Sequence, residues 1–365
     1  MAGDTSDQTA GIAFPMPLSM DIAALRRALL DWYDRAGRTL PWRIRPGDRA
    51  AGVTPDPYAI WLSEIMLQQT TVPHATPYWH RFLALWPTVD ALAGAETDAV
   101  MTEWAGLGYY ARARNLLACA RVVAGEMDGQ FPSHLDTLRT LPGVGEYTAN
   151  AIRAAAFDRP ANVVDGNVER VITRLRRIEA PLPKARPEIR NRAGEIADPD
   201  RPGDYAQAIM DLGATVCMPR APDCPVCPWQ DGCAAHAAGV ETDYPRKLAK
   251  KKRPTRYGTA HVVTRDDAVW LRKRVDSGLL GGMMEVPSTP WADSAPTDAP
   301  PFEAEWSDRG CVRHVFTHFT LDMTVLSAEA PDGWQPNEGG FVRRGEHPKQ
   351  ALPTLMKKIL RLAED

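Results

Sequence analysis

The amino-acid sequence contains no hydrophobic run that approaches the roughly 18 residues of a membrane-spanning helix. It also has no basic residue before Arg26, so its start lacks the positively charged region that opens a secretory signal peptide. Six cysteines in 365 residues are too few for a secreted disulfide scaffold. These absences predict a cytosolic protein that does not associate with a membrane.

The charge balance shows no strong excess of either sign. The formal net charge is −3, so any site for a polyanion must be a local patch. With 27 glycines and 32 prolines, the chain stays below the roughly one quarter of Gly plus Pro that marks low-complexity sequences. Its 365 residues are sufficient for two domains with substantial cores. We therefore expect a globular protein of two domains.

The hydrophobic periodicity changes along the chain. From Ile22 to about Ala238, apolar residues recur at helical spacing, which predicts an all-α region. Beyond Tyr257, short strand-like runs at 259–264, 268–272, 312–316 and 319–325, followed by a helix at 350–362, predict a small α/β or α+β domain. The expected limits are a loose arm at 1–20, a helical domain at 21–238 with a cysteine-rich module at about 200–238, a basic linker at 239–256 and the mixed domain at 257–365.

Four of the six cysteines form the pattern C-x6-C-x2-C-x5-C. Thiolates this close in sequence can bind one metal centre without help from the rest of the chain. Structural zinc sites usually use two paired short loops, whereas one C-x2-C pair with unequal flanking spacings favours a [4Fe–4S] cluster. Zinc remains an alternative, and disulfides are disfavoured in a reducing cytosol. The candidate ligands are Cys217, Cys224, Cys227 and Cys233. These four cysteines would fill every protein-side coordination position and leave none open for a substrate, so we expect a structural centre.

A glycine-containing turn separates two predicted helices. Leu135, Leu138 and Leu141 end the first helix, Pro142-Gly143-Val144-Gly145 follows, and the second helix begins near Tyr147. Glycines allow close approach of the backbone, and the amides at the start of a helix attract anions. This turn could hold a phosphate, although a plain connection between two helices is the alternative.

Two acidic side chains lie in settings that suit glycosidic chemistry. Glu64 lies on a predicted helix with apolar neighbours and no Lys or Arg one turn away, which favours a protonated carboxyl able to act as a general acid. The alternative is an exposed helix glutamate. Asp165 precedes a helix and could be a simple N-cap or a carboxylate that stabilises a sugar cation. An acid and a carboxylate are the two groups that cleavage of a glycosidic bond requires.

Together, these features resemble a known superfamily. The helix–Pro142-Gly143-Val144-Gly145–helix element, the later Val-Val-Asp165-Gly-Asn167 segment and the cysteine pattern are typical of helix–hairpin–helix DNA glycosylases of the endonuclease III type. Within it, the sequence from Ala24 to about Pro353 resembles the MutY-type adenine DNA glycosylases. The motifs concerned are Leu40-Pro41-Trp42-Arg43, WLSEIMLQQT from Trp61 to Thr70, GLGYYARARN from Gly106 to Asn115, and Met210-Asp-Leu-Gly213.

The resemblance implies a monofunctional enzyme. Bifunctional relatives carry a lysine at the position of Tyr147, and tyrosine cannot form a Schiff base with the sugar. Glu64 is implied as the acid that protonates adenine and Asp165 as the stabiliser or nucleophile at the anomeric carbon, supported by Tyr147 and Asn167. Further implied contacts are Gln68, Gln69, Tyr109, Gly143, Val144, Gly145, Thr317 and His318 to DNA, and Arg43 and Gln207 to adenine.

The C-terminal part resembles the Nudix-like module of the same family. Two motifs carry this resemblance: GLLGGMMEVP from Gly278 to Pro287, and Phe316-Thr317-His318. Thr317 replaces the family serine but keeps a hydroxyl group. A true Nudix hydrolase needs a glutamate-rich helix to bind magnesium, and nothing after Glu285 supplies it. The resemblance therefore implies a module that reads the lesion. His318 could instead be a core histidine.

The implied substrate is double-stranded DNA with adenine opposite 8-oxoguanine or guanine, bound by a monomer in the bacterial cytoplasm near the nucleoid. The linker cations Arg246, Lys247, Lys250 to Arg253 and Arg256 could lie along this DNA or form a solvated flexible run. Two other functions are possible. Tyr147 and the Nudix-like module disfavour an endonuclease III-like glycosylase for pyrimidines or mismatches. The presence of both Glu64 and Asp165 disfavours a non-catalytic iron–sulfur DNA-binding protein.

Overall fold

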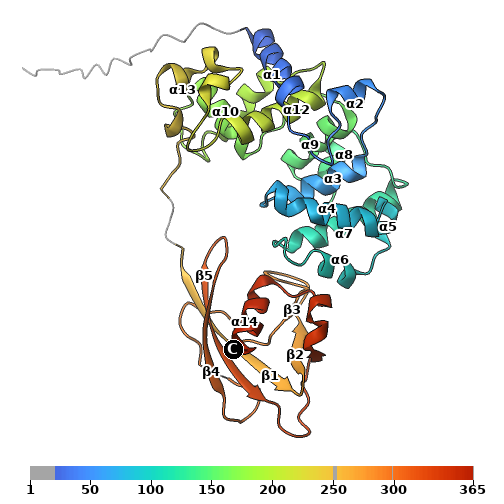
Figure 1. The fold of residues 1–365 in the computed structure, drawn as a ribbon, viewed down its shortest axis with the longest axis vertical. Coiled ribbons are helices and arrows are strands. Elements are labelled where there is room, and N and C mark those ends of the chain that lie inside the picture. The colour runs from blue at the N-terminus through green and yellow to red at the C-terminus, as the bar shows by residue number, and fades with distance from the viewer. Residues whose placement is uncertain (1–20, 250–252, 298, 365) are drawn as a thin grey trace, which may run out of the picture. The chain divides into compact units, whose positions relative to one another are not determined.

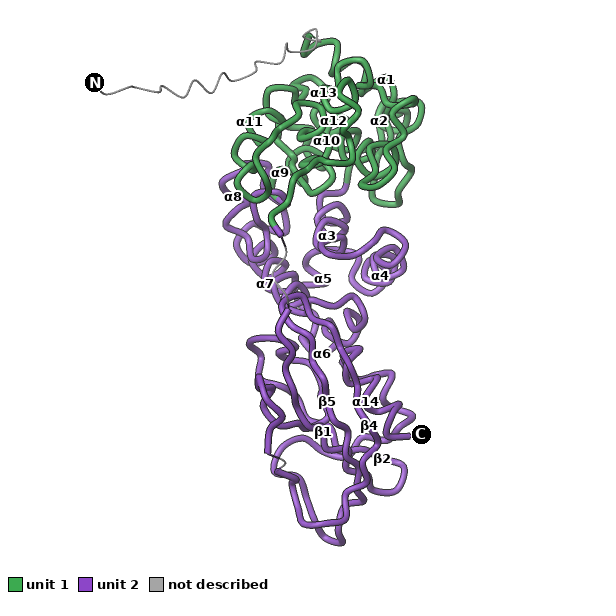
Figure 2. Tube along the Cα trace, turned by 90° about the vertical axis from the view of Figure 1, so that its left-hand side faces the viewer, with its two compact units in different colours: residues 1–55, 149–248 green, residues 56–148, 249–365 purple. Residues whose placement is uncertain are grey.

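A computed structural model describes residues 21–249, 253–297 and 299–364 (Figure 1). The predicted arm at 1–20 and linker residues Lys250, Lys251 and Lys252 lie outside the described residues. Two compact units contain the chain: residues 1–55 with 149–248, and residues 56–148 with 249–365 (Figure 2). The domain limits expected from sequence stay a prediction.

The first unit is helical. Its helices are α1 (Ile22–Ala36), α2 (Pro46–Ala50), α10 (Gly166–Arg176), α11 (Arg186–Ile196), α12 (Pro202–Asp211) and α13 (Ala234–Ala237). Shorter turns are η1 (Leu212–Val216), η2 (Cys224–Val226), η3 (Gln230–Gly232) and η4 (Glu241–Asp243). Helices α1 and α10 begin where an aspartate caps the first turn, since Asp21 and Asp165 accept hydrogen bonds from backbone N–H groups.

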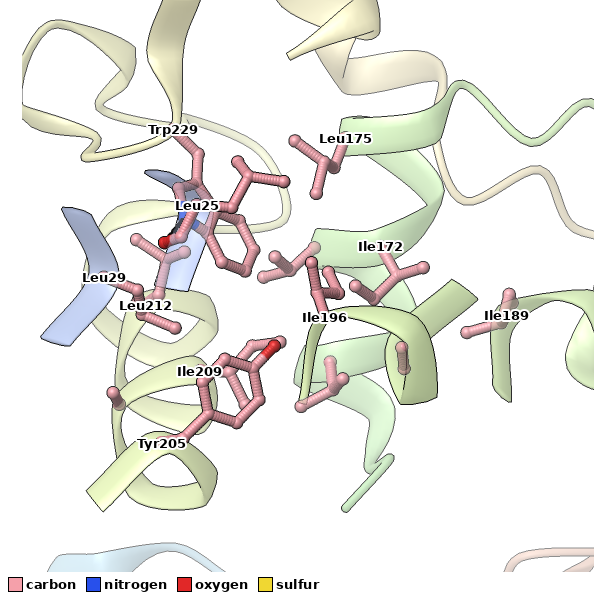
Figure 3. Close-up of a cluster of buried hydrophobic side chains, with 14 of the residues drawn as sticks. Leu25, Leu29, Ile172, Leu175, Ile189, Ile196, Tyr205, Ile209, Leu212 and Trp229 are labelled. Atoms are coloured by element: carbon pink, nitrogen blue, oxygen red, sulfur yellow. Dashed lines mark hydrogen bonds between the residues drawn. The ribbon is translucent and has the colours of Figure 1, made fainter. Parts of the chain in front are cut away.

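The core of the first unit joins distant parts of the sequence. Leu25 and Leu29, one turn apart on α1, pack with Ile172 and Leu175 of α10 (Figure 3). Trp229, from the cysteine-containing segment, enters the same core and donates its indole N–H to the carbonyl of Leu25 over 2.9 Å. The cysteine segment is therefore anchored in the core by an aromatic side chain.

The second unit contains helices and a sheet. Its helices are α3 (Pro57–Leu67), α4 (Val72–Leu85), α5 (Val89–Ala93), α6 (Thr97–Glu103), α7 (Ala111–Glu126), α8 (Leu135–Thr140) and α14 (Thr354–Glu364), with the 3₁₀ segment η5 (Arg344–Lys349). Helix α9 (Glu146–Phe157) begins in this unit, and its residues from Ala149 on belong to the first. No helix within the described ranges has the length and hydropathy needed to cross a membrane.

The sheet has the strand order β3-β2-β1-β5-β4, and β6 also pairs with β2. Its strands are β1 (Thr255–Arg265), β2 (Ala268–Lys273), β3 (Met284–Glu285), β4 (Ser307–Val315), β5 (Thr320–Glu329) and β6 (Gly340–Arg343). Strands β1 and β5 are parallel and the other pairs antiparallel, with α14 packed against β4 and β5 (Figure 1). This sheet with its helix confirms the expected α+β character.

The structure corrects several element boundaries. Strand β1 extends beyond the predicted run at both ends, β4 begins earlier and β5 ends later, because pairing of their backbones continues past the apolar residues. Phe316 and Phe319, predicted as strand ends, lie in the turn between β4 and β5. Strands β3 and β6 were not predicted. The last helix begins at Thr354 and not at 350, because Pro353 disfavours helical geometry in the residue before it.

Candidate functional site

Glu64 lies on a helix that is buried on nearly every side. Asp56 caps α3 by accepting the N–H of Tyr58, and Pro57 occupies the first turn, where its missing N–H costs nothing. Trp61 and Leu62 are fully buried, whereas Glu64 is half-buried. The exposed-glutamate alternative is therefore wrong.

Tyr147 is a hydrogen-bond partner of this carboxyl. Its phenol donates a hydrogen bond to Oε2 of Glu64 over 3.0 Å, although 83 positions separate them in sequence. Nearby, the Gln68 amide donates to the hydroxyl of Thr148 over 3.2 Å. The end of α3 and the first turn of α9 are thus joined by two side-chain hydrogen bonds.

Asp165 is the N-cap of α10. One carboxylate oxygen accepts the backbone N–H groups of Asn167 and Val168 at 2.9 and 2.7 Å, and the other accepts the Asn167 side-chain amide at 2.9 Å. The cap interpretation is confirmed, and it leaves a carboxylate fixed in one orientation. Asn167 donates two of these bonds, and its supporting role in catalysis stays a prediction. Asp165 and Asn167 belong to the first unit, Glu64 and Tyr147 to the second, and action of both acids on one nucleotide stays a prediction.

Arg170 connects Asp165 to the cysteine segment, a link that the sequence analysis missed. It donates to Oδ1 of Asn167 over 2.9 Å and to the carbonyl of Cys217 over 2.7 Å. Gly213, in the Met210-Asp-Leu-Gly213 motif, lies so close that a Cβ there would come within 2.6 Å of the Asn167 Cβ. The glycine of this motif is therefore required by close packing.

The four cysteines of the C-x6-C-x2-C-x5-C pattern line one cavity of the first unit. Arg174 is almost completely buried there and donates to the Cys217 sulfur at 3.3 Å and to the carbonyls of Met218 and Pro219. Burial raises the pKa of the Cys224 thiol to about 11 and of the Cys227 thiol to about 12. Metal ligation requires cysteines as thiolates, and four sulfur atoms at one cavity are a donor set that fits a metal centre.

Two further donors lie at the same cavity and were missed from sequence. The His236 Nδ1 is 2.5 Å from a carboxylate oxygen of Glu241, and that oxygen accepts from the Cys224 sulfur at 3.6 Å. The donor atoms of Cys224, His236 and Glu241 all lie within 4.8 Å of one another. The one available signal was the closeness of His236 and Glu241 to Cys233 in sequence.

The turn between α8 and α9 uses its two glycines differently. Gly143 has a φ of +75°, and a Cβ there would lie 2.9 Å from the Asn115 Cβ. Gly145 has open space where a Cβ would be. Val144 is buried and its N–H donates to the carbonyl of Leu141 over 3.1 Å, so its side chain contributes to packing. Gly143 therefore shapes the turn, whereas the space beside Gly145 is open.

Gln69 and Tyr109, the predicted wedge residues, share an unusual backbone conformation. Their φ angles are 59° and 50°, in the left-handed region that side chains other than glycine rarely adopt. Both are exposed, and both line a cavity of about 720 Å³ in the second unit together with Thr317 and His318. His318 is exposed, so the core-histidine alternative is wrong. Strained backbone of this kind is often found at functional sites.

Arg43 and Gln207 are already engaged within the first unit. Arg43 donates to both carboxylate oxygens of Asp211 at 2.8 Å, and Asp211 is fully buried. Gln207 accepts the hydroxyl of Tyr33 over 3.2 Å and donates to the carbonyl of Gly203 over 3.1 Å. Contact of either residue with adenine stays a prediction. To bind adenine, each side chain would have to use a further hydrogen-bonding atom or give up one of these bonds.

Comparison with known proteins identifies the class. Residues 62–196 match the model of the HhH-GPD superfamily base excision DNA repair proteins, and residues 258–362 match that of the NUDIX domain. A solved structure titled as a thermostable thymine-DNA glycosylase superposes with a TM-score of 0.52 at 26% identity, covering 60% of this chain and 97% of that one. The fold and the site thus define a helix–hairpin–helix base excision repair protein with an attached Nudix-like domain.

Two curated relatives narrow the class to one family. An adenine DNA glycosylase of Mus musculus is 35% identical over 94% of this chain and 79% of its own length. An adenine DNA glycosylase of Mycolicibacterium smegmatis is 38% identical over 70% of this chain and 91% of its own length. The chain belongs to the adenine DNA glycosylase family, as the motifs predicted.

Proposed function

We propose that this protein removes adenine from duplex DNA by hydrolysing its N-glycosidic bond, and that the adenine is mispaired with 8-oxoguanine or guanine. The observation that carries the proposal is the 3.0 Å hydrogen bond from Tyr147 to Glu64. It places a half-buried carboxyl beside a phenol, at the position where strand-cleaving relatives have an amine. Family membership supports adenine as the base removed.

Glu64 supplies the proton for the leaving base. The Tyr147 hydroxyl donates to Oε2 of this carboxyl, and the acid proton of Glu64 is transferred to the base. Proton transfer to adenine makes it a neutral leaving group, and the bond between its ring nitrogen and the anomeric carbon breaks with the electron pair staying on the base. Tyr147 holds the carboxyl in place.

Asp165 stabilises the sugar cation that remains. Its carboxylate is held by three N–H donors, so it presents negative charge without reorganising as positive charge develops on the sugar. Water then adds to the anomeric carbon and loses a proton, giving an abasic site and free adenine. Since Tyr147 cannot form a Schiff base, the strand stays intact.

The mispair is opened from the second unit. Extrusion of the target nucleotide costs a few kcal/mol and is cheapest at a mispair. Gln69 and Tyr109, exposed on strained backbone, fill the space that the nucleotide leaves, with Gln68 beside them. Thr317 and His318 contact the lesion strand, and Gly143 to Gly145 hold a backbone phosphate.

Cys217, Cys224, Cys227 and Cys233 would hold a [4Fe–4S] cluster, and this ligation would cross-link the segment around Trp229. Arg174 and Arg170 position Cys217 through its sulfur and its carbonyl. The protein acts as a monomer in the bacterial cytoplasm.

The proposal is tested with duplexes containing A:8-oxoguanine, A:G, A:T and T:G pairs. Single-turnover base release, with alkali to reveal abasic sites, is expected for the first two duplexes only. Borohydride added during the reaction should trap no covalent complex. Release of thymine would favour the mismatch-glycosylase alternative, and absence of any abasic site would favour a non-catalytic DNA-binding protein.

A further inference from the structure

Arg112 is a buried arginine whose described hydrogen bonds all go to the backbone. It lies in the first turn of α7, is 9% exposed, and packs its guanidinium over the ring of Trp104, with the Tyr109 ring also within 5.6 Å. Burial lowers its pKa to about 10, so the side chain stays charged at neutral pH. A buried charge of this kind requires strong partners.

Those partners are four carbonyl groups from two separate segments. One terminal nitrogen donates to the carbonyls of Ile65 and Met66 at 2.9 and 3.1 Å. The other donates to the carbonyls of Leu107 and Gly108 at 3.0 and 3.1 Å. The planar guanidinium provides several donors in one rigid group, which the single ammonium group of lysine cannot reproduce.

The first pair of carbonyls belongs to the C-terminal turn of α3, where backbone acceptors have no partner within the helix. A positive charge at this end of a helix is also favoured by the helix dipole. The second pair lies in the loop that precedes α7. Arg112 therefore joins the end of the helix that carries Glu64 to the loop that carries Tyr109.

Each segment leads directly into a residue in the left-handed backbone region. Gln69 follows Met66 by three positions, and Tyr109 follows Gly108. Such conformations persist only where the surrounding structure fixes the backbone. The four hydrogen bonds of Arg112 supply that fixation next to both residues.

We propose that Arg112 is a positioning residue that holds Gln69 and Tyr109 as one rigid wedge, so that the two side chains enter the duplex together when adenine is extruded. This inference rests on the proposed function, which assigns the wedge role to both residues. Arg112 itself touches neither the base nor the sugar.

The test uses Arg112→Lys and Arg112→Met, with Arg121→Lys as the matched control. Arg121 is on the same helix and also donates to backbone carbonyls, those of Ala93 and Ala95, but it is exposed and contacts neither segment. Extrusion is followed by the fluorescence of 2-aminopurine placed at the target position opposite guanine, at saturating protein and before any base is released.

We expect the wild type and Arg121→Lys to give the same fluorescence increase, and Arg112→Lys to reduce it about tenfold, the equivalent of one lost hydrogen bond of about 1.4 kcal/mol. A second measurement separates positioning from a loss of folding. In a Gln69→Ala/Tyr109→Ala background, which lacks the wedge, Arg112→Lys should change single-turnover adenine release less than twofold.

Equal fluorescence for Arg112→Lys and Arg121→Lys would overturn the inference. So would an equally large effect of Arg112→Lys with and without the wedge side chains, because that pattern indicates general destabilisation. If Arg112→Met fails to fold, Arg112→Lys alone decides. A wild type that binds the duplex without extruding the base would instead contradict the proposed function.

Discussion

The hydroxyl groups of Tyr109 and Thr317 lie 2.9 Å apart, although 208 positions separate them in sequence. Tyr109 belongs to the loop before α7, and Thr317 to the turn between β4 and β5, which the N–H of Phe316 closes by donating to the carbonyl of Phe319. A predicted wedge residue and a predicted lesion-reading residue are therefore in direct contact within the second unit.

We expect the hydroxyl of Thr317, and not its methyl group, to recognise 8-oxoguanine. Thr317→Ser is expected to retain the preference for A:8-oxoguanine over A:G, whereas Thr317→Val should lower it about fivefold, the equivalent of one hydrogen bond of about 1 kcal/mol. The ratio of single-turnover rates on the two duplexes measures this preference. A valine variant with the threonine ratio would exclude use of the hydroxyl.

Tyr147→Phe should slow adenine release about tenfold at saturating protein, because loss of a hydrogen bond of about 1.4 kcal/mol leaves Glu64 less well oriented. The dissociation constant for DNA should stay within about twofold, since the ring remains in place. Rapid-quench kinetics with a binding titration measure both quantities. An unchanged release rate would show that the phenol does not support the acid.

The two glycines of the α8–α9 turn should respond differently to alanine. Gly143→Ala is expected to lower the free energy of unfolding by about 1–3 kcal/mol, because of its positive φ and the contact with Asn115. Gly145→Ala should leave stability unchanged but weaken DNA binding about tenfold, because the new methyl group blocks a phosphate contact. Thermal melts and binding titrations separate the two effects, and normal DNA affinity of Gly145→Ala would argue against a phosphate at this turn.

The cysteine centre should contain about four iron and four sulfide per chain, with thiolate–iron absorbance in the visible range. Cys227→Ala is expected to lose the iron and to destabilise the first unit by at least several kcal/mol, because the binding energy of a structural metal contributes to folding. Cys311→Ala is the matched control, since Cys311 is exposed on β4 and far from the cluster motif in sequence. One bound zinc and no sulfide would show that the alternative metal is correct.

Local patterns predicted the helical part well, because apolar spacing and capping residues such as Asp165 act within a few positions of sequence. The very short strands β3 and β6 escaped prediction, since a strand of two or four residues is defined by a distant partner and not by its own composition. The boundaries of the longer strands β1, β4 and β5 were wrong because backbone pairing with a neighbouring strand, and not the apolar run itself, sets where a strand ends.

Some features of the candidate site could be predicted from sequence and others could not. The cysteine pattern and the acidic residue on α3 were visible in sequence. Family resemblance supplied Tyr147 as a supporting hydrogen-bonding group, and the structure shows its bond to Glu64. Arg112 could not be found this way, because its described hydrogen bonds all go to backbone carbonyls, which leave no signal in residue identity. The bonds that engage Arg43 and Gln207 likewise depend on tertiary packing.

The most direct test of the account is the single-turnover rate of adenine release from an A:8-oxoguanine duplex by the wild type and by Glu64→Gln, at saturating protein. The glutamine side chain keeps the shape and can still accept from Tyr147 but has no acidic proton, so the rate should fall at least about a hundredfold with DNA affinity retained. Adenine release by Glu64→Gln at the wild-type rate would contradict the assignment of Glu64 as the catalytic acid.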